Sequence, residues 1–133
     1  MAAPQLEMVE RGYAAWRRGD LEGAVAEFHP DFELIENPAF PEAGVYRGAA
    51  EFVRYAASFL EMFEEWRLDV EETIDAGEDV LVFVRWRVRG KASQALAELP
   101  IIHRWTFAEG RPIRMQSYLD RDEALAAVTP RTA

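Results

Sequence analysis

Residues 79–89 read DVLVFVRWRVR, and this stretch decides how the second half of the chain folds. Apolar side chains alternate with arginines along its second part, which is the pattern of a β-strand with one buried and one exposed face. The arginines are Arg85, Arg87 and Arg89. We expect them to face outward and to pair with Asp69 and Glu71, which alternate in the same way one strand earlier.

Three further strands are predicted around this one, over residues 66–75, 96–107 and 113–119. The breaks between them are short and contain glycine, which is typical of antiparallel hairpins. Strands this long make a sheet twist and curl, and a bulge near Pro100 would help the sheet to bend.

The first half of the chain is predicted to be mainly helical. Residues 5–18, 21–28 and 49–64 carry apolar side chains at helical spacing. A strand over residues 31–36 separates the second helix from the third. The loop over residues 37–48 contains two prolines and two glycines and would form part of a cavity rim.

Together these elements predict an α+β fold formed by one domain over residues 1–133. Three helices pack over the concave face of a curved antiparallel sheet and make a cone, and Asp120 caps a short C-terminal helix. So few helices cannot fill the cone completely, so an apolar pocket is the expected functional site.

The amino-acid composition indicates which partners are disfavoured and in which cellular compartment we expect the protein. The 133 residues carry a formal net charge of −9, which disfavours a nucleic-acid partner because binding to nucleic acid depends on clustered cations. The absence of cysteine is consistent with a reducing compartment. No run approaches the roughly 20 apolar residues that span a bilayer, and the first residues do not read as a signal peptide. We therefore expect a cytoplasmic protein with no membrane partner.

Glu36 is the leading candidate for a chemical role. Alternation along residues 31–36 puts it on the same face as Phe32 and Leu34. If that face is the core face, a carboxylate lies at the mouth of an apolar cavity. Burial raises the pKa of a carboxyl group, and this is the environment of a general base.

Four motifs carry a resemblance to a known family. They are YAAWRRGDL at 13–21, FHPD at 28–31, VYRG at 45–48 and HRWTF at 103–107. With these motifs the chain, from about Leu6 to Leu125, resembles the SnoaL-like branch of the nuclear-transport-factor-2-like superfamily. The resemblance implies the cone fold. It leaves function open, because the superfamily includes ketosteroid isomerases, polyketide cyclases, epoxide hydrolases, dehydratases and binding modules.

The ketosteroid isomerases provide a test of function within this superfamily. The resemblance carries their general base onto Glu36, but their two oxyanion donors fall on Gly12 and Ile102, which cannot donate from a side chain. Tyr13 lies one residue away from the first position, a turn of roughly 100° on a helix. Steroid isomerisation is therefore not expected.

The resemblance also implies which residues face the pocket. From the strands these are Val84, Trp86, Ile102, Arg104, Met115, Ser117 and Leu119, and from the helices Trp16 and Tyr55, to which the aromatic stripe of the third helix adds Phe59. Arg104 is assigned a catalytic role with Glu36. A guanidinium in an apolar cone pairs with that carboxylate or binds an acidic or carbonyl-bearing ligand. The alternative is an outward-facing Arg104.

His103 alternates with Arg104 and is therefore expected on the outer side of the sheet, beside Trp105. An apolar outer side predicts a homodimer through that face. The alternative is that a bulge near Pro100 exchanges the faces and brings His103 into the pocket as an acid or base.

Two functions follow from this pattern. The first is a small cofactor-independent enzyme of the isomerase, cyclase or hydrolase type that acts on a mostly apolar small molecule with Glu36 as base. The second is a non-catalytic module that binds a small ligand or only dimerises. No metal site is predicted, because the two histidines are far apart and cysteine is absent. No glycine-rich phosphate loop is present, so no cofactor is expected.

Overall fold

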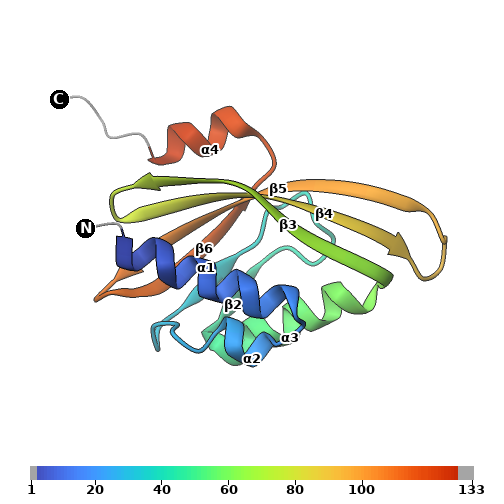
Figure 1. The fold of residues 1–133 in the computed structure, drawn as a ribbon, viewed down its shortest axis with the longest axis horizontal. Coiled ribbons are helices and arrows are strands. Elements are labelled where there is room, and N and C mark those ends of the chain that lie inside the picture. Colours follow the sequence, from blue (N-terminus) through green and yellow to red (C-terminus); the bar gives the residue numbers. More distant parts are fainter. Residues whose placement is uncertain (1–2, 129–133) are drawn as a thin grey trace.

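The structure is a computed structural model that describes residues 3–128. Its helices are α1 (Ala3–Arg17), α2 (Leu21–Ala24), α3 (Gly48–Glu61) and α4 (Arg121–Val128). Its strands are β1 (Glu33–Ile35), β2 (Val45–Arg47), β3 (Phe63–Ala76), β4 (Asp79–Gly90), β5 (Leu96–Ala108) and β6 (Arg111–Tyr118). The predicted α+β class is confirmed. Helices α1, α2 and α3 lie on one side of the sheet and α4 lies on the other (Figure 1).

The six strands form one sheet in the order β2-β1-β6-β5-β4-β3. All neighbouring strands are antiparallel except β1 and β6, which run parallel, so the sheet is mixed where a purely antiparallel one was predicted. Strand β2 was predicted as loop. Its three residues pair with β1 at the edge of the sheet, where so short a segment gives little alternation to read.

Aspartate side chains cap the N-termini of two helices. Asp20 accepts a hydrogen bond from the Gly23 N–H at 2.9 Å, and Asp120 accepts one from the Glu123 N–H at 2.9 Å. These bonds satisfy backbone donors that the first turn of a helix leaves unpaired. Asp120 therefore acts as the predicted cap of α4.

The pairing of β4 with β5 corrects the predicted face of β5. The pairs run without a shift from Asp79 opposite Thr106 to Arg89 opposite Leu96. Val84 lies opposite Ile101 and Val82 lies opposite His103, and directly paired residues share a face. Ile101, His103 and Trp105 therefore face the helices, whereas Ile102 and Arg104 face outward. No bulge occurs at Pro100, which pairs with Arg85; the irregularities lie in β3 and between Thr106 and Phe107.

The two faces of the sheet bury different clusters. On the inner side Trp86, Phe32 and Leu34 are at most 2% exposed and pack with aromatic residues of α1 and α3, among them Phe52, which is 1% exposed. On the outer face, Leu81, Phe83 and Ile102 pack under α4 around Ala124.

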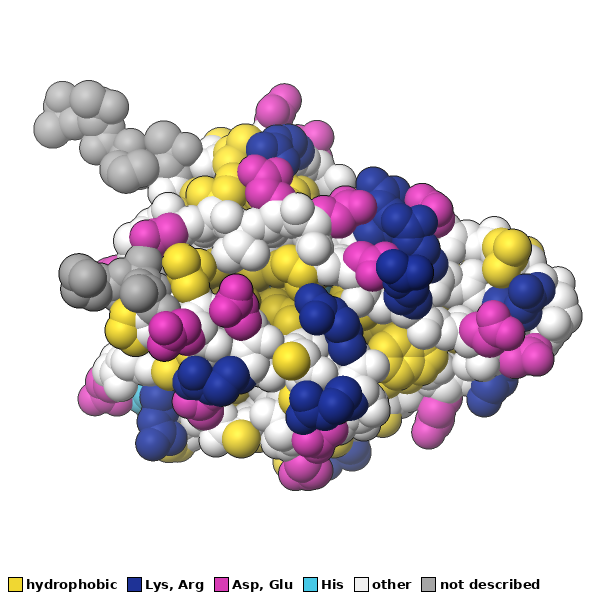
Figure 2. Space-filling model, in the orientation of Figure 1, with side chains coloured by type: hydrophobic (Ala, Val, Ile, Leu, Met, Phe, Trp, Pro, Cys, Tyr) yellow, Lys and Arg dark blue, Asp and Glu magenta, His cyan; other side chains and the backbone are white. Residues whose placement is uncertain are grey.

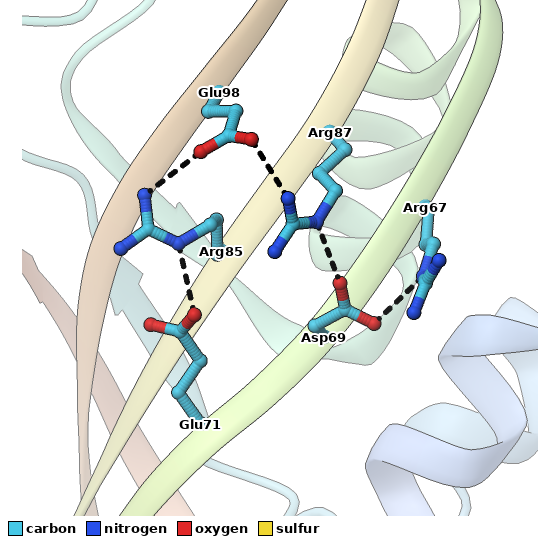
Figure 3. A network of polar contacts seen from close by, with 6 residues as sticks. All are labelled: Arg67, Asp69, Glu71, Arg85, Arg87 and Glu98. Atoms are coloured by element: carbon cyan, nitrogen blue, oxygen red, sulfur yellow. Dashed lines mark hydrogen bonds and ion pairs between the residues drawn. The ribbon is translucent and has the colours of Figure 1, made fainter.

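Charged residues cover the rest of the outer face. Arg85 donates to Glu71 at 2.9 Å and Arg87 donates to Asp69 at 3.0 Å, so the predicted pairs are confirmed. Glu98 on β5 bridges the two arginines, and Arg67 donates to Asp69 (Figure 3). The hydrogen bond from Arg87, aided by Arg67, lowers the pKa of Asp69. Positive and negative side chains are likewise interspersed over the face shown in Figure 2.

Candidate functional site

A cavity of about 40 Å³ lies between the inner face of the sheet and helices α1 and α3. Several predicted site residues line it, namely Glu36, Trp16, Tyr55, Phe59, Trp86, Met115 and Ser117. Residues that were not predicted complete the wall, namely Leu34, Phe40, Phe52, Ala56, Ile101 and His103. The predicted apolar pocket is thus present, and Glu36 lies in it.

Glu36 follows the end of β1 and is only 8% exposed. Its Oε1 accepts a hydrogen bond from the backbone N–H of Asn37 at 2.9 Å, and its Oε2 accepts one from the Tyr55 hydroxyl at 2.6 Å. Burial, followed by the hydrogen bond to the Glu36 carboxylate, raises the pKa of Tyr55 above its ordinary value, so Tyr55 stays protonated and donates. The carboxylate is therefore held in one orientation at the pocket wall.

Register brings Glu36, Ser117 and His103 into one row across three strands. Ile35 pairs with Gln116, so the next residues along the two parallel strands are Glu36 and Ser117. Ser117 in turn pairs with His103 on β5. The Asn37 side chain donates to the Ser117 carbonyl at 3.2 Å and ties β1 to β6 at this point. With strands about 4.8 Å apart, the Cα atoms of Glu36 and His103 lie roughly 10 Å apart with Ser117 between them, and all three residues line the cavity.

His103 is buried against aromatic rings. Its ring stacks on Trp16 with 5.7 Å between centroids and 7° between planes, and on Tyr13 at 5.9 Å and 13°. Burial lowers the pKa of His103 to about 3, so the imidazole is neutral at pH 7. Its Nδ1 lies 2.5 Å from the Tyr13 hydroxyl, so the other ring nitrogen, Nε2, is the one left for a ligand.

Arg104 does not enter the pocket, and its predicted placement beside Glu36 is wrong. It lies on the outer face, where its Nε donates to Asp79 at 3.0 Å and its Nη1 contacts Gln116 and Tyr118. The cause is the register described above, which sends even-numbered residues in this part of β5 outward. No lysine or arginine lines the cavity among the described residues.

Three further predicted residues lie outside the cavity wall. Ile102 faces α4 on the outer side. Val84 is on the inner face but is 1% exposed within the packed core. Leu119 follows the end of β6 and is 46% exposed.

Phe40 lines the cavity without having been predicted, whereas His103 lines it as the sequence allowed only in the alternative, and without the bulge that this alternative required. Phe40 belongs to the loop between β1 and β2, whose place over the pocket depends on tertiary contacts. The parity of His103 with Trp105 was recognised, but only the register with β4 shows that this shared face points toward the inner core. Within residues 3–128 no cluster of three metal-ligating side chains occurs, and no helix there is long and apolar enough to cross a membrane.

Comparison with known proteins identifies the family. The sequence matches the SnoaL-like domain over residues 9–115, which is most of the chain. The protein therefore belongs to the SnoaL-like family, within the nuclear-transport-factor-2-like fold. A comparison with curated proteins gives no match.

Solved structures share the whole fold. A nuclear-transport-factor-2-like protein from Burkholderia thailandensis is 27% identical with a TM-score of 0.80, and the match covers 98% of this chain and 100% of that one. The protein TerC, co-crystallised with polyporic acid, is 28% identical with a TM-score of 0.76, over 95% and 98% of the two chains.

More distant structures show the fold alone. A ketosteroid isomerase-like protein from Catenulispora acidiphila in complex with trimethylamine is 17% identical with a TM-score of 0.74, over 93% and 98% of the two chains. Proposed SnoaL-like polyketide cyclases and a proposed hydroxylase have the same fold at 15% to 20% identity.

Proposed function

We propose that the protein is a small cofactor-independent enzyme of the isomerase, cyclase or hydrolase type, which uses Glu36 as a general base on a mostly apolar small molecule. One observation carries this proposal. A buried carboxylate lies in one row with Ser117 and His103 inside a cavity that is otherwise apolar. A buried carboxylate without a cation beside it lowers the stability of the fold, so we expect that it is retained because it has a function.

The chemistry that fits this row is proton abstraction next to a carbonyl. Glu36 takes a proton from the carbon, and the electron pair of the broken C–H bond moves to the carbonyl oxygen to give an enolate. His103 Nε2 and the Ser117 hydroxyl lie on the same face and can contact that oxygen. Returning the proton to another carbon completes an isomerisation. In a cyclisation the enolate carbon instead attacks a second carbonyl, and the resulting alkoxide takes the proton back from Glu36. In a hydrolase, the same base would instead remove a proton from an attacking water.

The size of the cavity limits what the substrate can place beside Glu36. A space of about 40 Å³ holds only a small head group, since one water needs about 10–15 Å³ on this scale. A second hollow of about 110 Å³ adjoins it and shares Phe40, Tyr55 and Phe59 as walls. It reaches Met62 at the surface, which is 55% exposed. A substrate with a compact carbonyl head and an apolar tail fits both spaces.

A screen of small apolar ketones, diketones and epoxides, with products followed by mass spectrometry, tests this function. We expect Glu36→Gln to lower turnover by roughly 10²–10⁴-fold, the usual contribution of a general base. Glu61→Gln is the matched control, because this exposed carboxylate at the end of α3 lines neither the inner cavity nor the outer hollow. Equal turnover by the wild type and Glu36→Gln would remove Glu36 from the mechanism.

The second candidate is a non-catalytic module that binds a small amine. It is favoured by a cavity that holds one carboxylate and several aromatic walls, because aromatic faces and a carboxylate both attract an organic cation. Calorimetry with trimethylamine hydrochloride and with tert-butanol, a neutral compound of similar size, separates the two candidates. Binding of the amine alone, lost in Glu36→Gln, would support the module, and binding of neither would reject it.

We also propose that two copies associate through the outer face of the sheet, which keeps the predicted homodimer although Trp105 lies inside. This proposal rests on the charged network of Figure 3, which contains as many arginines as carboxylates, so two such faces can approach without net repulsion. Sedimentation equilibrium at low and high salt tests it; a monomer at both would contradict it. The cytoplasmic location stays a prediction of the sequence.

A further inference from the structure

Three buried side chains form a hydrogen-bonded chain behind the cavity. The Trp105 indole Nε1–H donates to the Tyr13 oxygen at 2.9 Å, and that oxygen lies 2.5 Å from His103 Nδ1. Tyr13 is 2% exposed, His103 is 3% exposed and Trp105 is 6% exposed. Tyr13 comes from α1, whereas the other two residues come from β5, so the chain joins a helix to the sheet.

The direction of each bond in this chain can be deduced from the chemistry of the groups. An indole N–H can only donate, so the Tyr13 oxygen is its acceptor. The Tyr13 hydrogen then points to His103 Nδ1, the other polar atom beside it. With a proton on Nδ1, the Tyr13 oxygen would accept from both Nδ1–H and the indole and its own O–H would have no acceptor, and a buried donor without an acceptor costs about 1–3 kcal/mol. Burial raises the pKa of Tyr13 above its ordinary value, so the hydroxyl keeps its hydrogen.

We infer that Tyr13 is a positioning residue that fixes neutral His103 in the tautomer with its proton on Nε2, so that this ring presents a hydrogen-bond donor to the ligand. This inference deepens the proposed function, on which its catalytic meaning rests. Nε2 has no hydrogen-bond partner among the described residues, and His103 lines the cavity in the row of Ser117 and Glu36. The site then selects ligands whose head group accepts a hydrogen bond, as a carbonyl oxygen does.

The tautomer can be measured without a ligand by nitrogen-15 NMR of the histidine side chains. The chain has two histidines, and His29→Gln assigns their signals. We expect the wild type to show an unprotonated Nδ1, a protonated Nε2 and a hydroxyl proton coupled to Nδ1. Tyr13→Phe should lose that coupled proton and give a mixture of both tautomers. Tyr46→Phe, at a tyrosine outside this chain of bonds, should leave the spectrum unchanged.

The outcomes separate this inference from the proposed function. A protonated Nδ1 in the wild type would overturn the inference, as would an unchanged spectrum in Tyr13→Phe. Circular dichroism checks that the variant folds, and if it does not, the wild-type spectrum alone decides the tautomer. Glu36→Gln should keep the wild-type tautomer, so the inference stands or falls independently of whether the protein has activity. Where turnover is found, Tyr13→Phe should lower kcat by about tenfold or more with KM little changed, because the donor acts on charge that develops in the transition state.

Discussion

The outer face of the β4–β5 hairpin contrasts sharply with the inner face of the sheet, where Glu36 lies at the end of β1. On the outer face every arginine has a carboxylate partner, from Arg85 with Glu71 to Arg104 with Asp79. On the inner face Glu36 has hydrogen bonds but no cation, and the neighbouring imidazole is neutral. An ion pair fixes a charge and makes it unreactive, whereas a lone buried carboxylate remains able to accept a proton. This contrast is the reason why we propose the inner face as the site of chemistry and expect the ion pairs of the outer face to contribute to stability alone.

The largest expected effect is on stability, from truncation of the inner face. Trp86 is 2% exposed and packs against Trp16, Phe59 and Trp66 with centroids 5.0 to 5.8 Å away. Trp86→Ala should lower the free energy of unfolding by about 3–5 kcal/mol. Urea denaturation measures this, and a loss below about 1 kcal/mol would show that the inner face is not a packed core.

His103 should make stability depend on pH. Its pKa is about 6.5 unfolded and about 3 folded, so below pH 6.5 the unfolded chain binds a proton that the folded protein does not. Stability therefore falls as pH drops from 6.5 toward 3, with a slope of up to about 1.4 kcal/mol per pH unit from this group.

Denaturation curves at several pH values test this dependence. The difference between the wild type and His103→Gln isolates the contribution of His103, because both proteins contain Asp69 and Glu72, whose pKa values arginines lower from 3.8 and 4.5. Identical slopes would mean that His103 is solvated, and the contrast between the faces would fail.

Arg104→Ala sharpens the contrast from the outer side. The pair with Asp79 is largely buried, with side-chain exposures of 23% and 13%, so removing Arg104 leaves Asp79 without its donor and should cost about 1–3 kcal/mol of stability. Turnover and ligand affinity should not change, because Arg104 does not line the cavity. A large loss of turnover in a variant that still folds would contradict this prediction and show that Arg104 contributes to the site.

The smallest effect is expected in the exposed part of the outer network. Arg87 is 43% exposed, so Arg87→Ala should cost only about 0.2–1 kcal/mol, and less at high salt because salt screens exposed charges. Chemical denaturation at two salt concentrations measures both values. A loss as large as that of Trp86→Ala would show that the ion pairs, not the aromatic core, hold the sheet.

The sequence predicted most elements because their periodicity is strong. The pairing of Arg85 and Arg87 with the acids of β3 followed from two strands joined by a tight turn at Gly77, whose φ of +84° suits glycine. Glu36 was placed in the pocket because it alternates with Phe32 and Leu34, which are at most 1% exposed, whereas the opposite face carries the charged Glu33.

The face of β5 could not be read in the same way. Ile101 and Ile102 are each 6% exposed, because the helices cover one side of the strand and α4 covers the other. When both faces of a strand are buried, the alternation of its residues does not show which face points to the inner core. That face must then be deduced from the pairing with the neighbouring strand. This is why Ile102 and Arg104 were predicted to face the pocket and His103 was expected on the outer side. The place of Phe40 had no periodic signal at all, because a loop has no repeating geometry.

The most direct test of the central claim is the exchange of α-hydrogens of 2-alkanones for deuterium in heavy water, followed by proton NMR. It requires only the base and the bound carbonyl, whatever reaction follows. The account predicts that wild type and Arg104→Ala accelerate exchange over buffer, whereas Glu36→Gln is slower by roughly 10²–10⁴-fold. Exchange at the same rate with Glu36→Gln as with wild type would contradict the claim that the buried carboxylate is the base.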